Sequence, residues 1–420
     1  MSEVLRFAMI TTFYPPYNFG GDGQAIRRLV HALARRGHRV EVIHDVDAYR
    51  ALSKGKEPTP LDEPEGVRVH GLQSRFGRLS CLATQQLGRP VVHGRTIRKI
   101  LSGGFDVIHY HNISLVGGPS ILSYGKGIKL YTAHEHWLVC PTHVLWRHNR
   151  ELCTGRECLR CVLNYRRPPQ LWRHTSLLER QSRHVDAFLS LSEFSAGKHA
   201  EFGFRFPMVP MPAFLPDGEP ARTSDPPEPA AGLPYYLFVG RLERIKGLQD
   251  VIPCFTGEGT SELWVAGTGE FEPELRRLAG QAPRIRFLGQ QSADRLRHLC
   301  RNAVAVVMPS VCYEVFPMVV LEAFREETPI IARALGPFPE IIARSQGGLL
   351  FHTNAELAAA LDSLVRDRPR RDAMGLAGAR AFKEHWHESV AMENYLRVIR
   401  DIAQRRGLSI GGRPLHDSPN

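Results

Sequence analysis

The feature that most constrains the fold is a repeated pattern, in which a short apolar run rich in β-branched residues precedes a longer stretch with helical spacing. The first half of the chain contains five such runs, FAMITTF, RVEVIHD, DVIHYHN, KLYTAH and AFLSLS. After the first run, AIRRLVHALARRG places apolar side chains on one helical face and arginines opposite, and Gly37 ends the helix. This alternation predicts βαβ units around a parallel sheet, which is a doubly wound α/β domain.

A proline-rich segment, residues 207–234, interrupts the alternation with nine prolines and few apolar side chains. We expect an interdomain linker there, because prolines remove backbone donors from helices and sheets. The pattern then restarts with the strands YYLFVGR, ELWVAG, IRFLG, AVAVVMPS, PIIAR and GGLLF. The sequence therefore predicts two tandem Rossmann-like domains facing across a cleft, at 1–206 and 235–385, with a helix at 386–406 that crosses back to the first domain and a tail at 407–420. In such folds ligands bind beyond the carboxyl ends of the strands.

Composition fits a soluble globular protein, with 43% hydrophobic and 23% charged residues. The chain shows neither the roughly 18 continuous apolar residues of a membrane-spanning helix nor a secretory leader. We therefore expect a cytoplasmic protein, with peripheral contact at the inner membrane face as a further option. The formal net charge of +11 favours ligands or surfaces that carry negative charge.

Residues 309–342 are the richest in chemical groups. A strand ends at Ser310, a loop carries Glu314, and a helix that begins near Pro317 carries Glu322. Free N–H groups at that helix end would bind an anion such as a diphosphate, while carboxylates accept hydrogen bonds from sugar hydroxyls. Taken alone, the two glutamates also fit ordinary solvated positions.

Two other strand-to-helix turns carry groups that bind phosphate. In VGRLERIKG, Arg241 and Lys246 can reach one phosphate group, although a basic pair there is also compatible with plain surface charge. In TTFYPPYNFGGDGQAI, Gly20 and Gly21 would let backbone amides approach a ligand. The spacing departs from G-x-G-x-x-G, which disfavours a nicotinamide cofactor, and a plain loop stays an alternative.

Together these motifs resemble the retaining glycosyltransferases of the GT-B fold, in particular the family-four group, also called glycosyl transferases group 1. The resemblance covers nearly the whole chain, from FGGDGQAIRRLVHALARRGHRVEV through D-V-I-H-Y-H, T-A-H-E, L-S-E-F-S, V-G-R-L-E-R-I-K-G and W-V-A-G-T-G to G-P-F-P-E. The spacing from Glu314 to Glu322 is similar to the E-x7-E signature of that group.

The resemblance implies a role for each matched residue. Arg241 and Lys246 would hold the donor diphosphate and stabilise the leaving group. Glu314 would contact hydroxyls of the transferred sugar, and Glu322 would bind the ribose. His134 would reach the donor sugar, Gly20 and Gly21 would lie between donor phosphate and acceptor, and further donor contacts would come from the backbone N–H groups near Phe316, Met318 and Val319.

The implied reaction moves a hexose from a UDP- or GDP-linked sugar to a glycan, lipid-linked or small-molecule acceptor, as in polysaccharide or glycoconjugate biosynthesis. No side chain presents itself as a covalent nucleophile, so we expect attack on the face from which the leaving group departs. His134 and His111 are alternatives for proton handling. No catalytic metal is required, because Arg241 and Lys246 supply positive charge. The rival functions are a nucleotide-sugar epimerase on the same fold and a catalytically silent scaffold.

A polar insertion within 140–161 carries four of the eight cysteines as C-x12-C-x4-C-x2-C, at Cys140, Cys153, Cys158 and Cys161. Four thiolates with a final C-x2-C would complete a tetrahedral structural zinc site. An iron–sulfur cluster, reduced thiols and a disulfide stay as alternatives.

Arginines on the first domain would seat the protein on anionic lipid, and a solvated basic surface is the other interpretation. They are Arg27, Arg28, Arg35, Arg36, Arg39, Arg166, Arg167, Arg173, Arg180 and Arg183. Nucleic acid is disfavoured, because the charge is not accompanied by stacking aromatics or a recognition helix.

Overall fold

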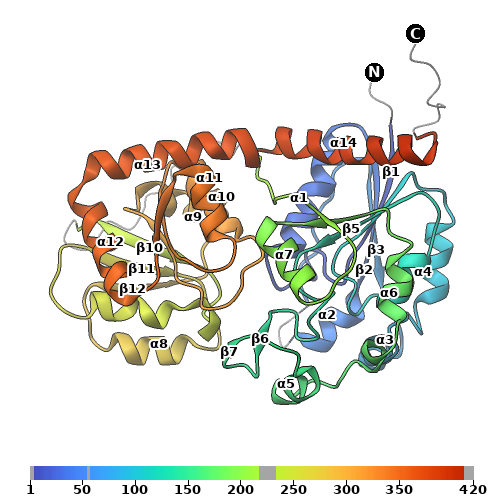
Figure 1. Ribbon diagram of the computed structural model, residues 1–420, viewed down its shortest axis with the longest axis horizontal. Helices are drawn as coiled ribbons and strands as arrows, with labels where there is room; N and C mark the ends of the chain where they lie inside the picture. The colour runs from blue at the N-terminus through green and yellow to red at the C-terminus, as the bar shows by residue number, and fades with distance from the viewer. Residues whose placement is uncertain (1–3, 54–56, 217–232, 411–420) are drawn as a thin grey trace, which may run out of the picture. The chain divides into compact units, whose positions relative to one another are not determined.

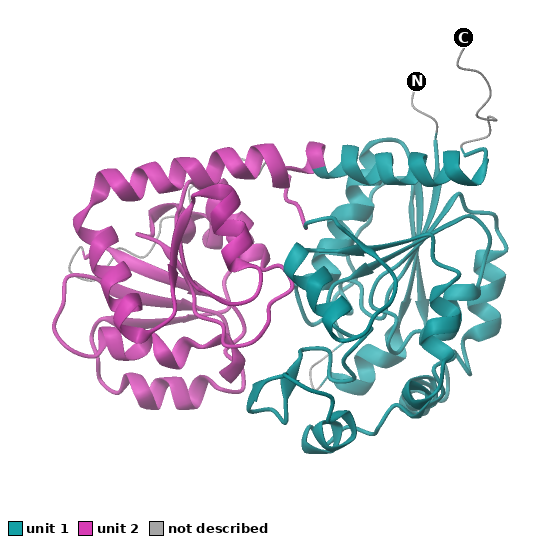
Figure 2. Ribbon diagram, in the orientation of Figure 1, with its two compact units in different colours: residues 1–212, 391–420 teal, residues 213–390 magenta. Residues whose placement is uncertain are grey.

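The computed structural model describes residues 4–53, 57–216 and 233–410, which form two compact units (Figures 1 and 2). Unit 1 contains the chain up to Pro212 and again from Ala391, and unit 2 contains residues 213–390. Most of the proline-rich segment, including Pro220, Pro226, Pro227 and Pro229, lies outside the described residues.

Unit 1 is built on a seven-stranded parallel sheet in the order β3-β2-β1-β4-β5-β8-β9. Central strands are buried along nearly their whole length, as expected where helices cover both faces of a parallel sheet. The strands are β1 Arg6–Ile10, β2 Arg39–Asp45, β3 Val67–Leu72, β4 Val107–Tyr110, β5 Ile128–Ala133, β8 Ala187–Ser190 and β9 Met208–Pro210.

The helices of unit 1 pack their apolar residues around this sheet, and the largest core includes Ile10, Tyr110 and Trp137. They are α1 Gly21–Arg35, α2 Val46–Leu52, α3 Arg78–Leu87, α4 Gly94–Leu101, α5 Cys158–Asn164, α6 Leu177–Ser182 and α7 Glu193–Glu201, with the 3₁₀ turns Pro119–Ser123 and Leu171–His174. A separate two-stranded hairpin, β6 Trp146–Arg147 and β7 Glu151–Leu152, precedes α5.

The long helix α14, Glu388–Arg406, contributes its residues from Ala391 onward to unit 1. Its Tyr395 hydroxyl lies 2.9 Å from His109 Nδ1 on β4, and its Arg406 pairs with Asp186 at 2.8 Å. Ile399 is fully buried. The chain therefore returns to its first unit after completing the second.

Unit 2 contains a six-stranded parallel sheet in the order β12-β11-β10-β13-β14-β15. Its strands are β10 Tyr235–Val239, β11 Glu262–Ala266, β12 Ile285–Gly289, β13 Val306–Met308, β14 Ile330–Arg333 and β15 Gly348–Phe351. Its helices are α8 Glu272–Ala279, α9 Ala293–Asn302, α10 Met318–Arg325, α11 Phe338–Ser345, α12 Asn354–Arg366 and α13 Arg368–Ala381, with short turns at Arg244–Lys246, Leu248–Asp250 and Ile252–Phe255.

The predicted fold class is confirmed, because both sheets are parallel and helices separate successive strands. Two local expectations were wrong. Residues 208–210 form β9 inside the predicted linker, since Pro210 is tolerated on an edge strand. The edge strand β3 was missed because its exposed positions give it no buried apolar run. The described part of the chain has no helix that is both long and apolar enough to cross a membrane.

Candidate functional site

The order in which strands are added to the sheet of unit 2 reverses between β10 and β13. These two strands pair directly through Leu237 and Val306. The chain runs outward from β10 to β11 and β12, then returns to begin again at β13. Loops that follow two such neighbouring strands diverge and leave a crevice, where ligands of open α/β sheets bind. The loop after β10 carries Arg241 and Lys246, and the loop after β13 carries Glu314.

An ion pair joins these two loops. Lys246 Nζ lies 2.7 Å from Glu314 Oε1, and Ser310 Oγ donates a hydrogen bond to the same oxygen at 2.7 Å. Burial opposes both charges, but each partner outweighs it, so the pKa of Lys246 is raised and the pKa of Glu314 is lowered from their usual values. Both side chains are therefore charged near neutral pH.

Arg241 belongs to the same electrostatic neighbourhood, although its side chain is 60% exposed. Its guanidinium pairs with Glu243 at 2.7 Å, and its positive charge also acts on Lys246 and Glu314. The structure thus brings together three of the four predicted donor-binding side chains. Ser310 joins them, and sequence analysis gave it no role beyond ending a strand.

The close approach of the two loops depends on Gly247. Its φ is +74°, and a Cβ there would lie 2.0 Å from the carbonyl oxygen of Pro309 at the end of β13. Any side chain would therefore push the Lys246 turn away from the strand that leads to Glu314.

Helix α10 begins at Met318, with Pro317 as the preceding cap residue, so the first-turn N–H groups lie in the segment predicted to bind the donor. Phe316 is buried, and Met318 and Val319 are half-buried. Glu322 lies one turn further along α10, where its charge helps raise the pKa of the buried Cys300, an effect due mainly to burial of the thiol. Its predicted contact with a ribose stays a prediction.

In unit 1 the order in which strands are added to the sheet reverses between β1 and β4. The predicted residues follow these two strands and the neighbouring strand β5. Gly20 and Gly21 lie at the start of α1, after β1. His111 follows β4 and His134 follows β5, with His111 Nδ1 and His134 Nε2 2.9 Å apart. Burial lowers the pKa of both histidines, and the nearby Asp22 partly opposes the effect on His134.

The four cysteines of the insertion are free thiols, with Cys140 and Cys161 buried and Cys153 and Cys158 half-buried. Arg173 contacts the rings of both Trp137 and Trp172, with its guanidinium carbon 5.3 and 4.5 Å from their centroids. Arg27 pairs with Glu63 at 2.9 Å. Arg27 and Arg173 therefore have partners within the protein. The expectation that they bind lipid did not take these partners into account.

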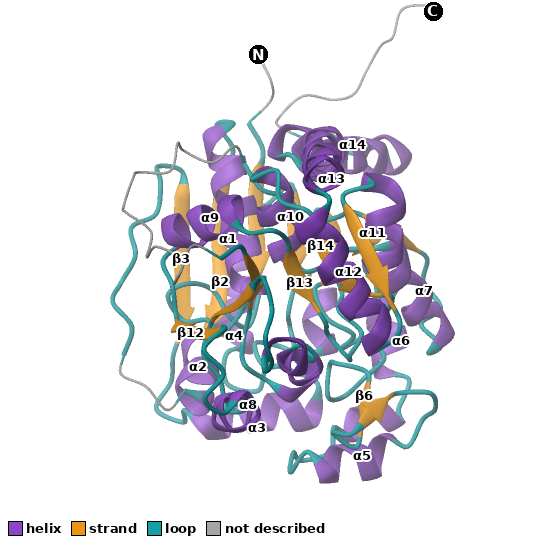
Figure 3. Cartoon of the chain, turned by 90° about the vertical axis from the view of Figure 1, so that its left-hand side faces the viewer, coloured by secondary structure: helices purple, strands orange, loops and turns teal. Residues whose placement is uncertain are grey.

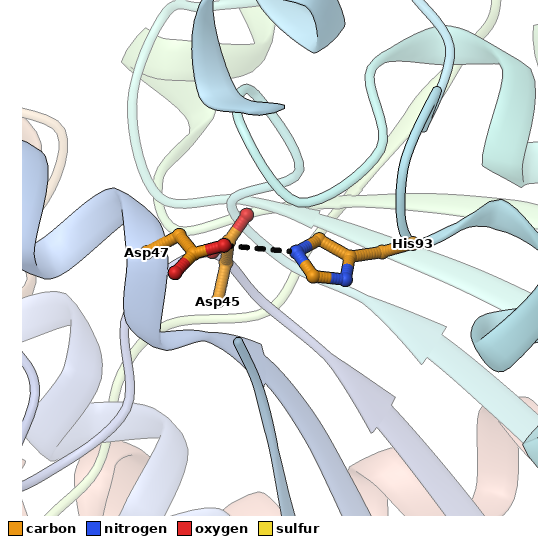
Figure 4. Close-up of side chains that lie close together, drawn as sticks. All are labelled: Asp45, Asp47 and His93. Carbon is orange, nitrogen blue, oxygen red and sulfur yellow. Dashed lines mark hydrogen bonds and ion pairs between the residues drawn. The ribbon is translucent and has the colours of Figure 1, made fainter. Parts of the chain in front are cut away.

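Sequence analysis missed a buried triad of Asp45, Asp47 and His93 (Figure 4). One ligand atom of each lies within 4.8 Å of the others, an arrangement compatible with a divalent cation. Hydrogen bonds already explain it: Asp45 caps α2 by accepting from Ala48 N at 3.0 Å, and Asp47 Oδ2 lies 3.3 Å from His93 Nε2. A cue was available in the sequence, since an aspartate before a helix is a common N-cap.

We expect the Asp45→Asn variant to gain stability relative to the parent protein as pH rises from 5 to 8. Burial, reinforced by Asp47, raises the pKa of Asp45 from 3.8 to about 7. A carboxyl group with a raised folded-state pKa costs stability progressively as pH rises from the unfolded to the folded value. Asparagine keeps the cap without that charge.

The difference in unfolding free energy between the variant and the parent should grow by roughly 1 to 3 kcal/mol over this range. It can be measured by urea unfolding at each pH, with Asp62→Asn as an exposed control. Because other ionisable groups lie near Asp45, only the difference between variant and parent is diagnostic. Parallel stability curves would contradict the assignment.

Comparisons with known protein families match almost the whole chain. Residues 19–210 match the family described as Glycosyltransferase Family 4, and residues 222–381 match Glycosyl transferases group 1. The first match includes the glycine loop and both histidines, and the second includes Arg241, Lys246, Glu314 and Glu322.

Curated relatives have similar length. Glycogen synthase of Mycobacterium tuberculosis is 27% identical over 398 residues, covering 86% of each chain. Phosphatidyl-myo-inositol mannosyltransferase of Mycobacterium leprae is 24% identical over 417 residues, covering 95% of this chain and 97% of the relative.

Solved structures share the fold. Sucrose-phosphate synthase from Thermosynechococcus elongatus superposes with a TM-score of 0.71 at 17% identity, covering 95% of this chain and all of the other. Anabaena Alr3699/HepE, solved in complex with UDP-glucose, gives a TM-score of 0.64 at 14% identity, covering 94% of this chain and all of the other. The two family matches, the parallel sheets and these neighbours show that the chain belongs to the group 1 glycosyltransferases, with a GT-B fold.

Proposed function

We propose that this glycosyltransferase moves a hexose from a UDP- or GDP-linked donor to a glycan, lipid-linked or small-molecule acceptor, with retention of anomeric configuration. The observation that carries the proposal is the Lys246–Glu314 ion pair, which lies where the strand order of the sheet in unit 2 reverses. Arg241 is close enough to act on both charges. Cations held there by neighbouring loops match the requirements of a sugar diphosphate.

The ion pair itself suggests how the donor is bound. A diphosphate carries more negative charge than one carboxylate, so it would compete with Glu314 for Lys246. Glu314 would then be released to accept hydrogen bonds from hydroxyls of the transferred sugar. First-turn N–H groups of α10, near Met318 and Val319, would bind phosphate oxygens.

Positive charge at the diphosphate would also lower the barrier to transfer. As the bond to the sugar breaks, negative charge grows on the leaving phosphate, and Arg241 and Lys246 are already in place to stabilise it. We propose on this basis that the reaction requires no catalytic divalent metal. Glu322 is proposed to bind the ribose.

Relatives support a nucleotide-sugar donor without fixing the nucleotide. Anabaena Alr3699/HepE was solved with UDP and with UDP-glucose. The mycobacterial relatives are a glycogen synthase and a phosphatidyl-myo-inositol mannosyltransferase, whose names indicate a glycan and a lipid acceptor. Both acceptor classes therefore stay within the proposal.

In unit 1, His134 and Gly20 with Gly21 are proposed to take part in the transfer. Burial lowers the pKa of His134 and of His111, so the hydrogen-bonded pair would be neutral at pH 7 and could donate or accept one proton. Retention would follow from same-face attack, with a donor phosphate oxygen taking the acceptor proton.

We expect Lys246→Ala to lower sugar transfer by at least about 10²- to 10³-fold, because the leaving diphosphate loses a preorganised cation. The measurement is turnover of UDP- and GDP-linked sugars with a panel of acceptors, and circular dichroism confirms that the variant is folded. Arg244→Ala is the matched control, since Arg244 is an exposed cation on the same short turn. Undiminished turnover by Lys246→Ala would reject the assignment.

The anomeric configuration of the product tests retention separately. We expect the product to keep the configuration of the donor, as read from the anomeric proton coupling in NMR spectra. An inverted product would overturn same-face attack. Epimerised donor without transfer would favour the epimerase alternative, and donor binding without either reaction would favour the scaffold.

We also propose that unit 1 contacts anionic membrane. Two segments of the sequence, residues 66–105 and 158–178, contain eleven lysines and arginines and no aspartate or glutamate, which equals the formal net charge of the chain. These segments include α3 and α5, which lie along the same lower edge of unit 1 in two perpendicular views (Figures 1 and 3).

Exposed apolar side chains gather on the same two segments. Of fifteen large hydrophobic residues exposed in the described chain, nine lie there: Val69, Phe76, Leu79, Leu82, Leu87, Val91, Leu159, Leu163 and Leu171. Hydrogen bonds join the segments, since Gln85 O accepts from Trp172 Nε1 at 3.0 Å and Gln85 Nε2 donates to Pro168 O at 2.9 Å. Apolar side chains among cations, in segments that carry no carboxylate of their own, suit the interface of an anionic bilayer.

We expect the double variant Leu159→Asp/Leu163→Asp to reduce binding to vesicles of phosphatidylglycerol and phosphatidylcholine by roughly tenfold, because it removes apolar contact and adds repulsion. Vesicle co-sedimentation at low and high salt measures this, and salt should weaken binding by the parent protein. Leu376→Asp, an exposed leucine on α13, is the control. Equal binding to neutral and anionic vesicles, or none, would overturn the proposal.

A further inference from the structure

The insertion that follows β5 contains an unusual density of unfavourable backbone conformations. Seven non-glycine residues of the described chain have positive φ. Four of them, His143, Leu145, His148 and Asn149, lie in this insertion, and Arg166 lies just after α5. Each such residue costs roughly 1 kcal/mol or more, and Leu145 lacks the short polar side chain that eases this conformation. A stabilising interaction must hold the segment in this form.

Hydrophobic packing provides little of that stabilisation. The regular structure of the insertion consists of the hairpin β6–β7, with two residues in each strand, and the seven-residue helix α5. Although Leu145 and Val162 are buried, Leu159 and Leu163 on α5 are 53% and 58% exposed. Small units with so little core usually depend on a disulfide or a metal ion.

The fold of the insertion gathers its four cysteines from three places. Cys140 precedes the hairpin, Cys153 immediately follows it, and Cys158 and Cys161 lie one turn apart on α5. The amide of Cys153 donates to Leu145 O at 2.8 Å, which closes the hairpin beside its first strand. Every one of the six pairs among these thiols is within electrostatic range.

One contact links the hairpin directly to a sulfur. The backbone N–H of His148, at the hairpin turn, donates to Cys161 Sγ at 3.2 Å. A thiol accepts such a bond weakly, whereas a thiolate accepts it well, and N–H···S contacts of this kind orient metal-bound thiolates. The donor, His148, is itself one of the residues with positive φ.

We propose that Cys140, Cys153, Cys158 and Cys161 bind one zinc ion, which stabilises the insertion. Four thiolates match the tetrahedral preference of structural zinc, and a C-x2-C pair at the start of a helix beside a hairpin provides two ligands from one face. Among the described residues, only Asp45, Asp47 and His93 place three ligand atoms within 4.8 Å, so the thiols lie further apart than the roughly 3.8 Å of a closed site. Rotation of the cysteine side chains would draw the sulfurs together around the ion.

The site would also fix one wall of a cavity of about 780 Å³ in unit 1, which Cys158, Leu159 and Val162 line from α5. Trp172 and Phe204 also line this cavity. Loss of zinc should therefore loosen this part of unit 1 while leaving the Lys246–Glu314 region of unit 2 intact.

The test is elemental analysis of full-length protein purified without metal-affinity resin. We expect one zinc per chain in the parent protein and in Cys254→Ser, where a half-buried cysteine elsewhere is replaced, and at least a fivefold loss in Cys158→Ser and Cys153→Ser. Asp47→Asn should keep its zinc, which separates this site from the buried triad. Replacement by Co²⁺ should give the visible absorption of tetrahedral cobalt thiolate.

Stability and proteolysis provide a second measurement that does not depend on glycosyl transfer. Chelation of the parent protein should lower its melting temperature by several degrees and expose residues 140–170 to protease, and added zinc should reverse both changes. Absence of zinc from protein that also fails to bind Co²⁺, stoichiometric iron, or zinc that persists in both cysteine variants would overturn the proposal. Because none of these readouts measures turnover, an inactive enzyme would not affect the result.

Discussion

The chemistry of unit 2 depends on one ion pair, in which Lys246 and Glu314 meet 2.7 Å apart across the two loops at the switch point of the sheet. Neither charge would be stable alone in this half-buried position, since burial opposes each of them. Because each charge is stabilised by the other, a ligand with more negative charge than Glu314 could replace it as the partner of Lys246. Under the proposed function, the same constraint that holds the loops together without ligand would prepare Lys246 to bind a diphosphate and Glu314 to bind the sugar attached to it.

Several glycines allow the loops around this ion pair to approach one another closely. Gly247 brings its turn against Pro309, and Gly336, with φ +67°, would place a Cβ 3.3 Å from the amide of Glu314. Gly267 has φ +140° and would place a Cβ 1.9 Å from Gly240 O, at the carboxyl end of β10. Glycines at these close approaches let loops from several strands converge, which side chains at the same positions would prevent.

The sequence predicted the fold more completely than the site. Runs such as KLYTAH and ELWVAG became β5 and β11, which are buried at every position, because a parallel strand covered on both faces is mostly apolar along its length. The edge strands β3 and β9 were missed, since one carries exposed residues and the other contains a proline. Pattern alone is weakest where the sheet meets solvent.

Within the site, the sequence located residues but not their partners. The family resemblance implied that Lys246 and Glu314 would both face a donor. The direct bond between them depends on the pairing of β10 with β13, whose paired residues Leu237 and Val306 lie 69 residues apart in the chain. The contacts of Ser310 with Glu314 and of His93 with the Asp45–Asp47 pair also depend on the tertiary structure, so the sequence did not predict them. Arg173 was assigned to the surface by its charge, whereas its guanidinium packs against two tryptophans from separate segments.

Sequence and structure together show where the excess positive charge of the chain is concentrated. An excess of eleven positive charges spread evenly would act mainly on solubility and on the rate of encounter with anions. Instead, two segments without any carboxylate meet along one edge of unit 1, where exposed leucines accompany the arginines. Because α5 contributes to that edge and also carries Cys158 and Cys161, a metal ion that fixes the insertion would also fix the orientation of Leu159 and Leu163. Metal binding and membrane contact would then be linked through the rigidity of one short helix.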